Sequence, residues 1–155
     1  MMKVDKKSLF LSVAICLLPI LIGVYYYDVL PEQIAVHFNV RGEPDNFVSK
    51  TRAIIDLPIF FAIVQVIISL VVDFDKTPKK GALIAKGIIP LISVLVQGGI
   101  VAYALDNNFN VPQLTVFVIG IVLIILGNYL PKKEFWGKYN FNLFGLEKGV
   151  NEQKV

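Results

Sequence analysis

Four long apolar runs constrain the fold of this chain more than any other feature. Each run has roughly 20 residues, which as a helix rising about 1.5 Å per residue would cross the roughly 30 Å hydrocarbon core of a bilayer. Hydrocarbon offers the backbone no hydrogen-bond partners, so such segments form helices. A hydrophobic content of 55% and a mean hydropathy of +0.67 agree with this reading. We therefore predict an all-α integral membrane protein, a bundle of four transmembrane helices at residues 9–27, 54–72, 84–105 and 111–130.

The distribution of basic residues predicts how the bundle is oriented. Of the 15 lysines and arginines, only Arg41, Lys50 and Arg52 lie in the first loop, residues 28–53, and none lies in the third. The other twelve lie before the first helix, in or beside the middle loop, or after the fourth helix. Basic residues are retained on the cytoplasmic side of membranes. We predict that both termini are cytoplasmic and that the first loop faces outward.

The ends of the chain require two further interpretations. Lysines 3, 6 and 7 precede the first apolar run, as in a signal peptide, but the run is long and its exit lacks a small-x-small cleavage pattern. We expect an uncleaved anchor that is kinked at Pro19. Residues 1–132 then form the membrane domain. Aromatic and apolar residues among lysines suggest that residues 133–155 form a cytoplasmic tail lying along the inner interface.

The outer loop has the pattern of a small β-hairpin-like cap. Its apolar residues at 34, 36 and 38 alternate with residues 35, 37 and 39, which predicts a strand with one packed face. Residues 43–46 resemble a turn with proline at its second position, and residues 47–48 would return as a second strand. An isolated hairpin is marginally stable in water, so this cap must pack on the helix ends.

The sequence does not decide at which residue the second helix starts. Ser49 is a plausible N-cap, which would place Pro58 inside the helix and bend it. Asp56 is the alternative cap, with Pro58 in the first turn. In the third helix, Gly98 and Ala102 form a small-xxx-small pair that favours close packing within the chain over dimerisation, although an oligomer stays open.

Catalytic chemistry has no support in the sequence. Phosphate-binding, dinucleotide-binding and hydrolase motifs are absent, and the single cysteine, Cys16, has no base at its depth. We predict a non-enzymatic protein without a cofactor or a metal, and the mild positive charge does not call for nucleic acid. The single histidine, His37, has acidic neighbours, but one histidine with scattered carboxylates is a weak metal site. The alternatives are a hydrogen bond within the loop and a pH-sensitive outer contact.

Polar residues inside the predicted helices are informative because they are costly in a bilayer. Gln65 and Gln97 lie near the middles of neighbouring helices, where they could bond to each other and join the helices. A small transporter or channel component would use them, with Asn128, to line a path. Asp56 is the one acid near a predicted span that is not plainly in a loop. Because the sequence then predicts no charged residue inside the bundle, it argues against a transporter.

Two motifs stand out when they are taken together. The first lies in the outer loop and consists of Leu30-Pro31, Ile34, His37-Phe38, Gly42, Pro44-Asp45 and Ser49-Lys50. The second lies at the end of the fourth helix and reads Gly127-Asn128-Tyr129-Leu130-Pro131-Lys132. In this order and spacing they resemble the SdpI family, bacterial membrane proteins of the sporulation-delaying-protein immunity type, and the domain that opens them.

The resemblance implies a function. It implies immunity to, or sensing of, a secreted peptide toxin at the outer face of the bacterial cell membrane, and contact with a cytoplasmic repressor protein. Longer family members continue into two further helices, so a chain of this length is expected to retain binding or immunity even if the missing half performs the repressor step. The alternatives are the transporter component above and an accessory subunit of a membrane complex. Candidate recognition residues are Pro31, His37, Phe38, Gly42, Pro44, Asp45 and Lys50.

Overall fold

The computed structural model describes residues 4–74, 79–106 and 108–129. Its elements are α1 (Lys6–Leu17), α2 (Pro19–Tyr25), β1 (Gln33–Phe38), β2 (Pro44–Ser49), α3 (Lys50–Phe74), α4 (Lys79–Leu105) and α5 (Val111–Tyr129). Four stretches are long and apolar enough to cross a membrane, and the first of them combines α1 and α2. The prediction of four membrane helices with a small two-stranded sheet is therefore confirmed, and the chain is a multi-pass membrane protein.

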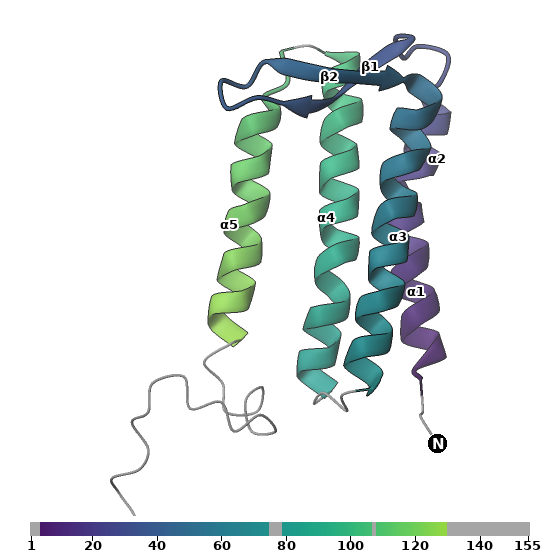
Figure 1. The fold of residues 1–155 in the computed structure, drawn as a ribbon, viewed down its shortest axis with the longest axis vertical. Helices are drawn as coiled ribbons and strands as arrows, with labels where there is room; N and C mark the ends of the chain where they lie inside the picture. Colours follow the sequence, from purple (N-terminus) through teal and green to yellow (C-terminus); the bar gives the residue numbers. More distant parts are fainter. Residues whose placement is uncertain (1–3, 75–78, 107, 130–155) are drawn as a thin grey trace, which may run out of the picture.

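The helices stand side by side, and the hairpin of β1 and β2 lies across one end of them (Figure 1). We call this the hairpin end, and the other the opposite end. The helices α1, α3 and α4 pack against one another, and α2 continues α1 along α3 and α4. Within the described residues, the main helical neighbour of α5 is α4, so α5 stands at the edge of the bundle.

The first membrane span is interrupted where the sequence predicts a kink. Pro19 has no backbone N–H, so one bond of the helical ladder is missing between α1 and α2, while Leu18 between them keeps helical dihedral angles. The span starts three residues earlier than predicted because Asp5 caps it: the Asp5 carboxylate accepts a hydrogen bond from the Ser8 backbone N–H at 3.1 Å. Farther along, Gly23 lets α2 approach α3 closely, since a Cβ there would lie 2.5 Å from Cγ2 of Ile54.

The turn of the hairpin lies earlier in the chain than predicted. The Asn39 backbone N–H donates to the Glu43 carbonyl at 2.9 Å, and the Gly42 N–H donates to the Asn39 carbonyl at 2.9 Å. The Asn39 side-chain oxygen also accepts bonds from the backbone N–H groups of Arg41 and Glu43, at 2.8 and 3.0 Å. Asparagine side chains stabilise turns in this way. Gly42 has a φ of +81°, a conformation that glycine adopts without strain.

The prediction of a turn at residues 43–46 was therefore wrong. Pro44 begins β2 opposite Phe38, and Asp45 and Asn46 lie within the strand. Proline is tolerated at the first residue of a strand, so its presence did not require a turn. The Asn39–Gly42 turn chemistry, which the sequence also contains, decides the geometry.

Substitution of Gly42 tests this turn and its contact with α5. A Cβ at Gly42 would lie 2.9 Å from Cγ of Pro112, at the start of α5, and the positive φ disfavours any other residue. We expect Gly42→Ala to lower the free energy of unfolding by about 1 kcal/mol or more, measured by thermal unfolding in detergent. Gly87→Ala is the matched control, because nothing lies within 4 Å of a Cβ there. An equal loss in both variants would contradict the turn assignment.

The apolar core lies at the hairpin end. Alternation along β1 holds for Ile34, Val36 and Phe38, of which Ile34 is buried and Phe38 stacks edge-on with Tyr103, ring centroids 4.9 Å apart. Ala35 is also buried, because the strand pairing is irregular between residues 35 and 37. The buried members of this core are Leu30, Ile34, Ala53, Ile54, Ile100 and Val101.

The start of α3 resolves the alternative left open by the sequence. The helix begins at Lys50, directly after Ser49, and Pro58 lies inside it. Asp56 is therefore not the cap. It accepts a hydrogen bond from Nε of Arg52, one turn earlier, at 2.9 Å. The predicted close packing at Gly98 of α4 is not seen, since nothing lies within 4 Å of a Cβ placed there. The close contact is at the next residue, where the Leu114 side chain of α5 packs against Gly99.

Candidate functional site

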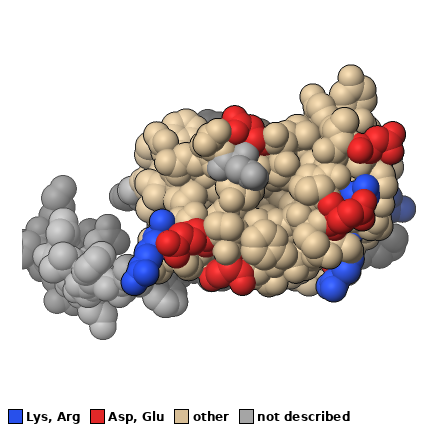
Figure 2. Space-filling view, turned by 90° about the horizontal axis from the view of Figure 1, so that it is seen from above, with Lys and Arg blue, Asp and Glu red and all other residues tan. Residues whose placement is uncertain are grey.

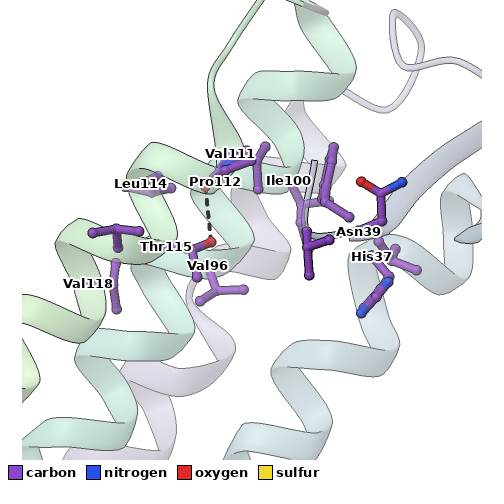
Figure 3. A pocket seen from close by; sticks show the side chains of 13 residues that line it. His37, Asn39, Val96, Ile100, Val111, Pro112, Leu114, Thr115 and Val118 are labelled. Carbon is purple, nitrogen blue, oxygen red and sulfur yellow. Dashed lines mark hydrogen bonds between the residues drawn. The ribbon is translucent and has the colours of Figure 1, made fainter. Parts of the chain in front are cut away.

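A cavity of about 420 Å³ lies beneath the hairpin, between β1, α4 and α5 (Figure 3). We call it the groove. Its size is within the roughly 300–1,000 Å³ typical of small-ligand sites. Most of its lining is apolar and comes from three elements. These apolar residues include Val36 and Phe38 of β1, Val96 and Ile100 of α4, and Leu114 and Val118 of α5.

Two polar residues of the hairpin line the groove, and a carboxylate holds each of them. His37 Nδ1 lies 2.5 Å from Asp45 Oδ1 across the two strands. The Asn39 side-chain amide donates to the Glu43 carboxylate at 2.9 Å. The groove therefore has an apolar wall along the helices and a polar rim at the hairpin, with carboxylates behind that rim.

Several predicted recognition residues meet at the groove. His37 and Phe38 line it, Asp45 binds His37, and Gly42 brings the hairpin turn against Pro112, which also lines the groove. These residues are close in the sequence because they belong to one hairpin, in β1, the turn and β2.

Other predicted residues do not reach the groove. Lys50 lies at the base of the hairpin, where its Nζ is 2.9 Å from Glu32 Oε1 and 4.6 Å from the centroid of the Tyr27 ring. Its backbone N–H donates to the Glu32 carbonyl at 3.0 Å. The contacts of Lys50 with Glu32 and Tyr27 join the hairpin to α3. Pro31 is exposed just before β1, and Pro44 starts β2.

The hairpin end carries more acidic than basic side chains. Figure 2, which views this end from above, shows red carboxylates and fewer blue basic groups around a largely uncharged surface. At the hairpin end, the described residues include three bases, Arg41, Lys50 and Arg52. The six acids are Asp28, Glu32, Glu43, Asp45, Asp56 and Asp106. Electrostatic attraction at this end therefore favours a positively charged partner.

The intramembrane glutamines join helices, but not by the mutual bond considered from the sequence. Gln65 Nε2 donates to the Lys86 carbonyl of α4 at 3.0 Å and to Ser69 Oγ at 3.1 Å. Gln97 Nε2 donates to the Ala53 carbonyl of α3 at 2.9 Å. Asn128 is exposed near the opposite end of α5, so the three do not line one path. Within the part of the chain described, the Oε1 atoms of both glutamines are buried without a partner.

A buried ion pair lies toward the opposite end and was missed from the sequence. Lys86 Nζ of α4 is 2.6 Å from Asp73 Oδ1 of α3, and the two side chains are only 5% and 12% exposed. The expectation of no buried charge was therefore wrong, as was the assignment of Asp56 as the one acid in or near a span. Asp73 follows Gln65 and Ser69 at a spacing of four, which places all three on one face of α3. That periodicity was the available signal.

The same carboxylate also binds the start of α1. The Asp5 backbone N–H donates to Asp73 Oδ2 at 3.0 Å. Asp73 thus joins α1, α3 and α4 at a single point.

No group of three or more His, Cys, Asp or Glu side chains gathers within the described residues. His37 instead binds a single carboxylate, which is the loop contact considered above. The groove therefore offers apolar packing, the hydrogen-bonding side chains of His37 and Asn39, and carboxylates close behind them. This combination is suited to binding a ligand.

Comparison with known proteins finds a similarity over part of the chain. Residues 14–62 match the model of a domain of unknown function, DUF1648. The match includes α2, the hairpin and the first half of α3, whereas α4, α5 and Asp73 lie outside it. No curated protein and no solved structure matches the chain. The hairpin is thus the element that the matched family and the candidate site share.

Proposed function

We propose that this chain is a non-enzymatic immunity or sensor protein that binds a secreted peptide toxin at the outer face of the bacterial cell membrane. The observation that carries the proposal is the groove, which combines an apolar wall within the membrane-spanning helices with a polar rim on the hairpin. The resemblance of the hairpin sequence to the SdpI family supplies the class of ligand. Bias of lysine and arginine toward the other loops supports an outward-facing hairpin.

The groove suits an amphipathic peptide lying in the outer leaflet. Apolar side chains of such a peptide would pack between α4 and α5, beside Ile100 and Leu114. Its polar face would meet His37 and Asn39 at the rim. The acidic hairpin end favours a peptide with net positive charge. Occupation of the groove removes the peptide from the bilayer, which is sufficient for immunity, and contact with a cytoplasmic repressor would add sensing.

A survival assay tests this function. We would express the chain in a sensitive bacterium and challenge the cells with peptide-containing supernatant from the native host, against an empty vector. Thr115→Trp places a large side chain in the groove, and Phe117→Trp is the control on the exposed, opposite face of the same helix, outside the groove lining. We expect Thr115→Trp and His37→Ala to lower the toxin dose that the cells survive by about tenfold, or roughly 1.4 kcal/mol of binding, while Phe117→Trp protects normally.

Membrane levels of each variant, measured by immunoblot, separate binding from folding. Failure of the native chain to protect at a normal membrane level would refute the immunity proposal. Full protection by Thr115→Trp would instead refute the groove as the site.

A second candidate, a small transporter component, draws support from the buried Asp73–Lys86 pair, because ionisable residues inside membranes often mark transport paths. Ion flux in proteoliposomes that disappears with Asp73→Asn would favour it. Lack of flux in the native chain would exclude it.

A further inference from the structure

The half of the bundle at the opposite end is held together differently from the half at the hairpin end. Within the described residues, the buried apolar core contains no member from α1. The residues that α1 buries are Ser12 and Cys16. It packs along α3 and α4, and polar contacts join it to them: Ser93 Oγ of α4 donates to the Cys16 carbonyl at 2.9 Å, and the Asp5 N–H binds Asp73.

The other half of the same span, α2, is held by close packing against α3. Gly23 of α2 is pressed against Ile54, and Ile20 packs on the apolar core. Pro19, where the helical ladder loses one hydrogen bond, separates this segment from α1, although Leu18 keeps a helical conformation. Proline removes one rung of the helical hydrogen-bond ladder, so bending there breaks fewer bonds than elsewhere.

We propose that α1 is a hinged segment that swings about Leu18–Pro19, and that the Asp73–Lys86 ion pair is the latch that holds it closed. Asp73 uses one carboxylate oxygen for Lys86 and the other for the backbone of Asp5. Loss of the Asp73 carboxylate therefore removes the contact of α3 with the N-terminal end of α1 and its ion pair with α4 together. Hinges of this kind move rigid elements between discrete states.

The open state would expose a polar surface at the opposite end. Gln65 and Ser69 of α3 and Ser93 of α4 are fully buried in the closed state. Gln65 Oε1 has no partner there among the described residues, so it is an acceptor ready for a new donor. This two-state device does not depend on the proposed function, since it concerns the other end of the molecule.

The native cysteine reports the open state. Cys16 is the single cysteine of the sequence and is 0% exposed. N-ethylmaleimide reacts with the thiolate, which forms only where water reaches the thiol. Its alkylation rate in the full-length protein, reconstituted in lipid nanodiscs, therefore reports how often the opened end of the bundle admits water to Cys16. We expect Asp73→Asn to raise this rate by roughly 100-fold, and Asp73→Glu, which keeps a carboxylate for Lys86 and for the Asp5 N–H, to retain most of the protection. Pro19→Ala, added to Asp73→Asn, should slow alkylation by stiffening the hinge.

Two controls distinguish a hinge from general loosening. Arg52→Gln breaks an exposed pair on the same helix and should leave the rate unchanged. A second reporter, Val101→Cys in a Cys16→Ser background, lies in the core at the hairpin end and should stay protected in Asp73→Asn. Equal acceleration at positions 16 and 101 would overturn the proposal, and so would an unchanged rate at Cys16 in Asp73→Asn.

Discussion

Lys86→Met is expected to lower the free energy of unfolding by about 3–5 kcal/mol, the usual cost of leaving one charge of a buried pair without its partner. The remaining Asp73 carboxylate would keep the Asp5 N–H but lose its ammonium at a 12% exposed position. Unfolding in mixed micelles with increasing denaturing detergent, followed by circular dichroism, measures the loss.

A double variant separates this penalty from the net value of the pair. Combining Lys86→Met with Asp73→Leu removes both charges, and we expect most of the stability to return. Arg52→Met serves as the reference for an exposed pair and should cost less than about 1 kcal/mol. If the double variant were as unstable as Lys86→Met, the buried charge of Asp73 would not be the cause of the loss.

Ile54→Ala is expected to cost about 2–5 kcal/mol, because Ile54 is 2% exposed at the centre of the apolar core. The cavity would open beside Gly23, whose missing Cβ is what allows Ile54 to fit. Adding Gly23→Ala should therefore recover part of the loss, whereas Gly23→Ala alone should destabilise the protein by crowding Ile54.

The test is whether Gly23→Ala, which destabilises the native protein, stabilises the Ile54→Ala variant. The same micelle unfolding assay measures both free energies. Strictly additive effects of Gly23→Ala and Ile54→Ala would contradict the close packing of α2 on α3. Ile55→Ala is the matched control, because Ile55 is 37% exposed and faces away from the core. It should cost clearly less than Ile54→Ala.

The sequence predicted the elements of this fold well because bilayer-spanning length is a strong local signal. It located the four spans, the break at Pro19 and a hairpin between the first two spans. The turn was misplaced because Pro44 and Asp45 have turn propensity, yet the side-chain bonds of Asn39 and the positive φ of Gly42 determine the geometry.

The site was predicted only in part because its other half comes from distant helices. His37, Phe38 and Asp45 were identified, but the residues of α4 and α5 that complete the groove are ordinary apolar residues of membrane helices. The pairing of Asp73 with Lys86 was missed for a related reason. Each lies near a loop, and either charge alone resembles an interfacial residue. Asp73 lies one residue beyond the predicted end of its helix and Lys86 two residues inside the predicted start of the next, and their burial depends on the packing of α3 against α4.

The contact between Gly42 and Pro112 has a consequence for biosynthesis. The hairpin leaves the ribosome before α3, while Pro112 belongs to the last of the four spans. The groove therefore does not exist on a nascent chain, however well its first three spans have inserted. It is completed when α5 is delivered beneath the hairpin turn, so that the order of synthesis itself keeps an unfinished chain from presenting a ligand site.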